Sequence, residues 1–242
     1  MTRSGHGPSV SVEDALEWFE RHGKRKNIDG LKRYGITATK PFGVTVGETK
    51  KYAKQIGKNH ALAQQLWASG RYEARLLASF IDDPEQVTVR QMNQWADDFD
   101  NWAIVDTVCF HLFDRAPASW KLVPKWAKAK PEFKKRAAFA LLWSLSVHDK
   151  EALDESFRKC LPFIERGAED DRNFVKKAVN MALRAIGKRN VALNAAAIEA
   201  AQRLAKSDSR AAQWVGNDAI KELTSPAVTR RLTAKHRAVR RG

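Results

Sequence analysis

The sequence predicts an all-α fold, an α-solenoid in which antiparallel helix pairs stack into a superhelix with a concave basic face. Three observations lead to this fold class. Apolar residues recur at spacings of three and four, whereas the alternating pattern of a half-buried strand is nearly absent. Helix-start signals repeat along the chain. Aromatic residues begin helix-like segments every 30 to 41 residues, a period typical of stacked helix pairs.

Start and stop signals delimit the expected helices in chain order. In a capping box, a hydroxyl side chain and an acid or amide three residues later satisfy free amides of the first helical turn. A serine followed by proline fits an N-cap and the first helical position, and glycine commonly follows a helix. The capping boxes are Ser11–Asp14, Thr45–Glu48 and Thr88–Gln91, the Ser-Pro start is Ser225–Pro226, and the expected stops are Gly57, Gly70, Gly167 and Gly187.

A weak internal repeat supports the solenoid. Three of its segments place a cation three residues after the aromatic residue, and small or aliphatic residues follow that cation. The aromatic residues are Tyr72, Trp102, Phe133, Phe174 and Trp214, at intervals of 30, 31, 41 and 40 residues.

Stacking of these repeats would align their cations. Arg75, Arg136 and Lys177 would then form a ladder on one surface, where they could follow the backbone of a duplex. The alternative is an ordinary helical bundle whose Lys and Arg side chains are simply solvated. The repeat favours the solenoid.

The charge of the chain favours a polyanionic partner. Its 43 Lys and Arg outnumber its 28 Asp and Glu, which gives a net charge of +15. Nucleic acid is the usual partner of such a chain, although a ribosomal or membrane surface would also suit the charge. Residues 229–242 hold six of these cations and no acid, and the rest of the chain is basic as well.

These features predict three segments. We expect residues 1–10 to be a flexible N-terminal segment and residues 11–228 to be a single helical-repeat domain. We expect residues 229–242 to be a mobile basic tail that adds salt-sensitive affinity for nucleic acid. The alternative for this tail is an unstructured, solubilising end.

Cysteine usage and hydropathy predict a cytoplasmic protein. Cys109 and Cys160 lie 51 residues apart in apolar stretches, so we expect them to pack as small hydrophobes in a reducing compartment. The N-terminus lacks the apolar core of a signal peptide. The longest apolar run, residues 137–143, is too short to cross a bilayer. With no oligomer signal and no expected membrane contact, we expect a monomer.

Several common sites can be excluded by spacing. The glycine-bearing segment of residues 41–47 lacks the Gly-Lys-Ser/Thr ending of a phosphate loop, so it predicts a turn before a capped helix. The six histidines show neither of the zinc motifs HxxxH and HExxH. Asp97, Asp98 and Asp100 lack the glycine of a calcium loop and suit the start of a helix better. We therefore expect no metal ion and no organic cofactor.

The pair formed by Trp102 and Asp106 is the candidate site. A spacing of four places the two residues on one helix face, and the other helical neighbours of Asp106 are Ala103, Cys109 and Phe110. A carboxylate in such apolar surroundings needs a distant partner or a chemical role. Two interpretations remain open: a structural aspartate that caps a helix or pairs with a distant arginine, and a functional one.

A family resemblance favours the functional interpretation. DNWAIVD, residues 100–106, resembles the W-x-x-x-D core of the AlkD-like DNA alkylation repair glycosylases. The resemblance extends over roughly Gly30 to Arg189 and includes, in order, GITATKPFGVTVGETKKYAKQIGK, LWASGRYEARLLASFI, FKKRAAFALL and FVKKAVNMALR. It implies a superhelix of HEAT-like helix pairs. It also implies release of N-alkylated, mostly cationic purines from double-stranded DNA.

The resemblance assigns roles to particular residues. Asp106 matches the catalytic carboxylate, which would stay ionised, stabilise an oxocarbenium-like sugar and orient water, and Trp102 matches an aromatic residue of the lesion pocket. Arg136 and Arg184 match phosphate-binding residues. Arg75 and Lys177 would bind further phosphates without reading sequence.

One departure from the family keeps other functions open. Met181 stands where the family often has a second pocket tryptophan, and a methionine offers no aromatic face. The chain is therefore interpreted first as a monofunctional alkylpurine DNA glycosylase. The alternatives are a non-catalytic module that binds duplex or branched DNA, and a solenoid that binds an acidic protein.

Overall fold

The computed structural model describes residues 10–239, and its side chains up to residue 234. These residues form helices and connecting turns, and no strand occurs among them, so the all-α prediction is confirmed. The α-helices are α1 Val12–His22, α2 Arg25–Arg33, α3 Val46–Ile56, α4 His60–Ala68, α5 Tyr72–Ile81, α6 Val89–Asp97, α7 Trp102–His111, α8 Ser119–Trp126, α9 Glu132–His148, α10 Asp154–Arg158, α11 Leu161–Ala168, α12 Asn173–Gly187, α13 Val191–Ala205, α14 Arg210–Leu223 and α15 Pro226–Val239; the short 3-10 helices are η1 Pro84–Gln86 and η2 Phe113–Arg115.

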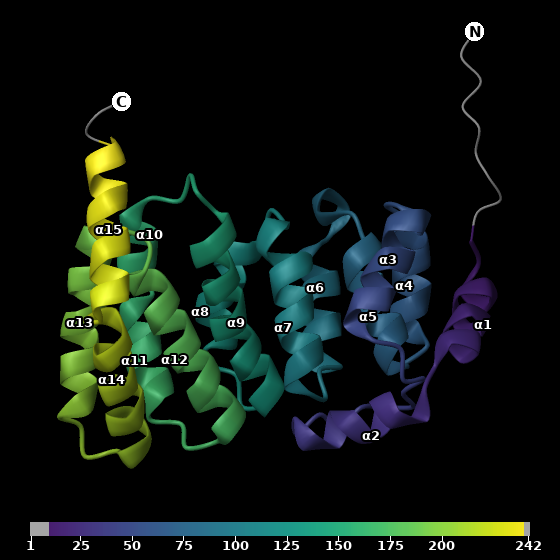
Figure 1. Ribbon diagram of the computed structural model, residues 1–242, viewed down its shortest axis with the longest axis horizontal. Helices are drawn as coiled ribbons and strands as arrows, with labels where there is room; N and C mark the ends of the chain where they lie inside the picture. Colours follow the sequence, from purple (N-terminus) through teal and green to yellow (C-terminus); the bar gives the residue numbers. More distant parts are fainter. Residues whose placement is uncertain (1–9, 240–242) are drawn as a thin grey trace, which may run out of the picture.

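The helices are arranged as a solenoid. One layer, which we call the inner layer, contains α3, α5, α7, α9, α12 and α14, and each of these helices packs against the next. A second layer contains α4, α8, α11 and α13, which pack against α5, α9, α12 and α14 respectively. The helices stand side by side in a row from α1 to α13–α15, and α2 lies across their ends (Figure 1). This row of stacked pairs confirms the predicted solenoid over the ordinary bundle.

The predicted helix starts are formed largely as expected. Capping boxes with both hydrogen bonds begin α1 at Ser11 and α3 at Thr45. Thr88 accepts a hydrogen bond from the backbone amide of Gln91 and begins α6. The Gln91 side chain instead donates to the Asp82 carboxylate at 2.6 Å, so this third box is only half formed.

The predicted glycine stops fall into two groups. Gly57 and Gly70 follow α3 and α4 with φ values of +76° and +67°, a positive φ that glycine adopts readily and other residues rarely do. Gly167 and Gly187 lie within the last turns of α11 and α12. A Cβ on Gly167 would approach the ring of Phe139 to 2.4 Å. These two glycines are therefore explained by close helix packing rather than by chain reversal.

A buried carboxylate anchors the turn before α3. The Glu73 side chain, on α5, accepts hydrogen bonds from the backbone amides of Phe42, Gly43 and Val44 at 2.8, 2.7 and 3.2 Å. Gly43 has φ +88°, and a Cβ there would lie 2.3 Å from the carbonyl oxygen of Lys24. The segment predicted as a turn is thus fixed to the inner layer, and it holds α2 in place at one end of the cleft described below.

Both cysteines are free and buried, as predicted. Burial raises the pKa of the Cys160 thiol to about 11 and that of the Cys109 thiol well above its usual value. Both therefore behave as small apolar side chains. None of the described helices is long and apolar enough to cross a bilayer.

The end of the chain differs from the predicted domain boundaries. Residues 226–239 form α15, which packs against α13 and α14 and buries Leu232. Most of the predicted mobile tail, 229–242, is therefore helical and continues the solenoid beyond residue 228. The predicted N-terminal segment, 1–10, lies almost wholly outside the described residues.

Candidate nucleic-acid interface

Trp102 is the first residue of α7, and it connects that helix to α2. The Asn101 side chain caps the helix by accepting from the amides of Ala103 and Ile104. This cap directs the indole toward the end of α2, where its N–H donates to the carbonyl oxygen of Tyr34 at 2.9 Å. A residue 68 positions earlier in the chain thereby becomes a neighbour of the site.

Asp106 forms a bidentate ion pair with Arg136 of α9. Nε of Arg136 donates to Oδ1 of Asp106 at 2.9 Å, and Nη2 donates to Oδ2 at 2.6 Å. The remaining nitrogen, Nη1, donates to the carbonyl oxygen of Phe174 at 2.6 Å. The Asp106 side chain is 18% exposed and that of Arg136 is 6% exposed. Asp106 thus pairs with an arginine that is distant in the sequence, as the structural interpretation of this residue expected.

The same ion pair constrains Arg136. Each of the three nitrogens of this guanidinium donates one hydrogen bond to a protein acceptor, which uses three of its five N–H groups and holds the side chain in place. The contact of Arg136 with the DNA backbone stays a prediction, because Arg136 lines the cleft described below although its side chain is only 6% exposed. Its guanidinium carbon also lies 5.9 Å from the centre of the Trp102 ring, so one arginine connects both residues of the predicted pair.

The pair also determines the charge of the carboxylate. Burial raises the pKa of Asp106, and the Arg136 guanidinium opposes that shift. Both carboxylate oxygens accept from charged donors, an arrangement that requires the ionised form. Asp106 is thus a negative charge that is held in place next to an indole.

A cleft opens beside this pair, with a volume of about 550 Å³. Trp102 and Arg136 form part of its wall, and the loop after α2 and the start of α12 form the rest. The cleft combines aromatic and cationic side chains, a combination suited to a nucleic-acid ligand. Its other lining residues are Arg33, Tyr34, Gly35, Asn173, Phe174 and Lys177.

Lys177 and Arg75 are two further predicted phosphate ligands, and only Lys177 lines the cleft. Lys177 is exposed and lines the cleft, so its predicted role stands as a prediction. Arg75 is occupied, because Nη1 donates to the carbonyl oxygen of Asp98 at 2.9 Å and lies 3.9 Å from the carboxylate of Asp100. Its guanidinium also lies 5.0 Å from the ring of Trp67, within the protein. The ladder of equivalent cations is therefore not a row of free charges.

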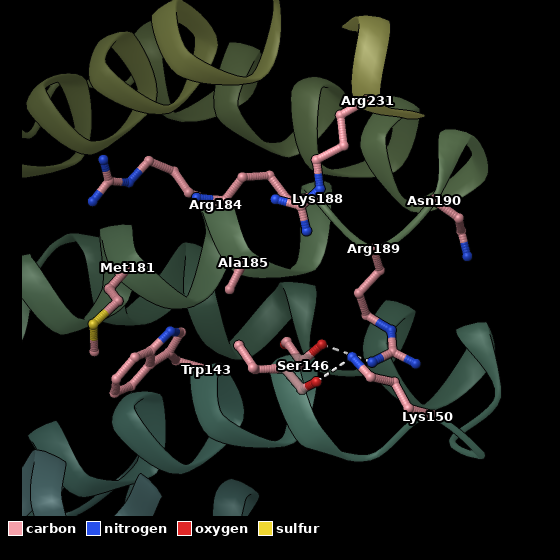
Figure 2. A pocket seen from close by; sticks show the side chains of 11 residues that line it. Trp143, Ser146, Lys150, Met181, Arg184, Ala185, Lys188, Arg189, Asn190 and Arg231 are labelled. Atoms are coloured by element: carbon pink, nitrogen blue, oxygen red, sulfur yellow. Dashed lines mark hydrogen bonds between the residues drawn. The ribbon is translucent and has the colours of Figure 1, made fainter. Parts of the chain in front are cut away.

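Met181 and Arg184 line a different pocket. They lie one and two turns beyond Lys177 on α12, where they line a pocket near the end of that helix and not the cleft (Figure 2). Arg184 forms an ion pair with Glu222 of α14, and its Nη1 lies 3.6 Å from the carboxylate of Asp218. Its predicted phosphate role thus competes with two acids.

The sequence did not identify Trp143, which lies beside Met181 (Figure 2). Its ring stacks on that of Phe110 with centroids 4.6 Å apart. Trp143 comes seven residues after Arg136 and Phe110 four residues after Asp106, so helical spacing alone places both on the faces already singled out. An aromatic surface therefore lies near Met181 although residue 181 is not a tryptophan.

Comparisons with known proteins agree with this architecture. A sequence model of the family described as "DNA alkylation repair enzyme" matches residues 15–223. Among solved structures, the chain is similar to one described as "A new family of proteins related to the HEAT-like repeat DNA glycosylases with affinity for branched DNA structures". The two share 22% identity and a TM-score of 0.72, over 86% of this chain and 94% of that one. No curated protein sequence matches significantly. The structural likeness confirms the HEAT-like helical fold.

Proposed function

This chain belongs to the family of DNA alkylation repair enzymes, and from that premise we propose that it is a monofunctional DNA glycosylase. Its substrate would be duplex DNA that carries positively charged N-alkylated purines, and its reaction would be hydrolysis of the N-glycosidic bond. The observation that carries the proposal is the ion pair of Asp106 with Arg136, because Arg136 and Trp102 line the cationic cleft and Asp106 lies one helical turn after Trp102.

The chemistry of the substrate fits a single carboxylate. A purine that already carries a positive charge leaves without protonation, so no second acid is needed for the leaving group. Bond cleavage creates an oxocarbenium-like sugar, and a fixed negative charge close to that sugar lowers the barrier. Asp106 would stabilise this charge and orient the attacking water, while Trp102 would present its electron-rich face to the cationic base or sugar.

Arg136 is best assigned to positioning. Its guanidinium fixes both carboxylate oxygens and opposes the effect of burial on the pKa of Asp106. In this role Arg136 would keep Asp106 in its ionised form, so that no proton has to leave the carboxyl group before the reaction. Lys177 and Arg33, both exposed at the cleft, would bind backbone phosphates.

A second function is favoured by the same geometry. Both oxygens of Asp106 are engaged by Arg136, whose charge offsets part of the field that a cationic sugar would experience. A protein that keeps this pair purely for structure would bind DNA without releasing a base. The similar solved structure is described as having affinity for branched DNA, which agrees with such a module.

Release of free methylated purine from methylated duplex DNA separates the two functions. We expect the wild-type protein to release base, and we expect Asp106→Asn to abolish release while duplex binding persists, because asparagine keeps the size and removes the charge. Equal release by the variant and the wild type would refute the catalytic role. Duplex binding without release by the wild type would favour the binding module.

Asp106→Asn leaves the Arg136 guanidinium buried without its anion and could therefore unfold the protein. A second variant controls for this effect. The double variant Asp106→Leu/Arg136→Met removes both charges, a replacement that buried ion pairs often tolerate. We expect it to fold, to bind duplex DNA and to release no base. Base release by a folded double variant would contradict the proposal independently of the single variant.

A further inference from the structure

A second pocket, which we call the α15 pocket, lies where the last turn of α12, the end of α9 and helix α15 meet. Its volume is about 420 Å³, and Figure 2 shows cationic side chains from all three segments around it. Trp143 and Met181 contribute apolar surface at one side. The cations are Lys150, Arg184, Lys188, Arg189 and Arg231.

Arg189 is the most constrained of these cations. It donates from Nη1 to the carbonyl oxygen of Ser146 at 2.7 Å and from Nη2 to that of Ala152 at 3.5 Å. Its Nε is buried and has no acceptor, and it forms no ion pair with the described side chains. Burial lowers the pKa of Arg189, and the charges of Asp149 and Asp154 oppose that shift only in part. An anion in the pocket would add to their effect.

The acids near the pocket compensate only part of its charge. Glu222 pairs with Arg184 and, at 2.6 Å, with Lys188, and the carboxylate of Asp218 lies 3.6 Å from Arg184. Lys150 donates to the carbonyl oxygen of Val147, which carries no charge. Among the described side chains, neither Lys150 nor Arg231 forms an ion pair. The pocket therefore retains an excess of positive charge.

We propose that the α15 pocket binds a phosphate group of a nucleic-acid backbone, at a position separate from the cleft beside Asp106. This inference rests on the proposed binding of DNA but not on base release. The matched family region ends at residue 223, whereas α15 begins at Pro226, so Arg231 is added by a helix outside that region. A backbone phosphate suits cations that are splayed around an open, polar pocket, because they hold charge without reading sequence.

The test compares two neighbouring arginines of α15. Arg231 lines the pocket, whereas Arg230, also exposed, donates to the carbonyl oxygen of Pro226 and does not line it. The affinity for an unmodified duplex is measured over a series of salt concentrations for the wild type, Arg231→Ala and Arg230→Ala. Loss of one phosphate contact makes the slope of log K against log salt shallower by about 0.9.

We expect Arg231→Ala to bind severalfold more weakly with this shallower slope, and Arg230→Ala to retain the wild-type slope. Lys150→Ala provides an independent check from α9's side of the pocket, and its slope should change in the same direction. Equal effects of Arg231→Ala and Arg230→Ala, or no effect of Arg231→Ala and Lys150→Ala, would overturn the site. Thermal unfolding shows that each variant is folded before binding is measured.

Two further measurements separate this inference from its alternatives. Inorganic phosphate is added at constant ionic strength: if it raises the unfolding temperature of the wild type but not of Arg231→Ala, and leaves duplex binding unchanged, the pocket takes a small anion and the backbone assignment is overturned. Base release under saturating protein is followed in parallel. Base release by the wild type tests the glycosylase proposal, whereas the salt slopes of Arg231→Ala and Arg230→Ala test the pocket, so the two failures are visible in different assays.

Discussion

Two ion pairs connect consecutive helices of the inner layer, and they differ chiefly in burial. Asp106 and Arg136 join α7 to α9 with side chains 18% and 6% exposed. Arg184 and Glu222 join α12 to α14 with side chains 30% and 31% exposed, and Lys188 shares the same glutamate. In the first pair, Arg136 binds both oxygens of Asp106 and also donates to the carbonyl oxygen of Phe174. In the second pair, Arg184 lines an open pocket.

This difference determines what each pair can do. A buried charge that loses its partner bears an uncompensated desolvation cost, so the first pair is needed for the fold as well as for any chemistry. Half-exposed charges are screened by water and contribute little to stability, so the second pair can exchange partners when an anion arrives. The same kind of contact is thus structural in the middle of the solenoid and adjustable near its C-terminal end (Figure 1).

Breaking the buried pair should have the largest effect. Arg136→Met leaves the Asp106 carboxylate buried without its partner, and we expect the free energy of unfolding at pH 7 to fall by about 3–5 kcal/mol. Urea denaturation followed by circular dichroism measures this change. The double variant Asp106→Leu/Arg136→Met should recover most of the loss. If the single and double variants are equally unstable, the stranded charge is not the cause, and loss of packing or of the Phe174 contact would explain the result.

The sequence predicted much of this architecture because local signals determine helices. The capping residues Ser11 and Thr45 and the aromatic period are readable without tertiary context, and they predicted the solenoid correctly. Partner choice is not local. Nothing near Asp106 in the chain points to Arg136, 30 residues later, and nothing near Arg75 points to Asp98. The sequence therefore predicted a ladder of free cations, whereas Arg75 and Arg136 form ion pairs with acids in the structure.

Two other features also depended on contacts between distant segments. Tyr34 reaches the site only because the Glu73 carboxylate fixes the turn before α3 and Trp102 binds the end of α2. The basic end of the chain was expected to be a tail because its charge is high, but burial of Leu232 against the solenoid allows a helix. The high positive charge of this segment thus indicated a nucleic-acid partner but did not predict the helix α15.

The pH dependence of Arg136→Met should follow from the buried carboxylate. Burial raises the pKa of Asp106, and removal of the guanidinium leaves that effect unopposed. A raised folded-state pKa penalises the folded state above that pKa, and the penalty disappears as the carboxylate becomes protonated. The stability gap between the variant and the wild type should therefore narrow as pH falls from 7 toward about 4, the ordinary pKa of aspartate. A gap that stays constant over this window would show that charge is not its origin.

Changing the exposed cluster should alter binding more than stability. Glu222→Gln removes the acid that neutralises Arg184 and Lys188, so the α15 pocket becomes more positive. We expect tighter duplex binding, up to about tenfold at low salt, with a steeper salt dependence. Glu169→Gln, an exposed residue at the end of α11, makes the same change of charge away from the pocket. Equal gains from the two variants would indicate a general charge effect.

The smallest effect on stability is expected for Arg184→Met, the exposed counterpart of Arg136→Met. Lys188 retains Glu222 as a partner, and the lost ion pair is open to water. The free energy of unfolding should therefore fall by less than about 1 kcal/mol, with little dependence on pH. Both variants replace an arginine of the inner layer by methionine and can be measured in the same urea titrations. A loss for Arg184→Met as large as that for Arg136→Met would break the comparison, because burial would then not distinguish the two pairs.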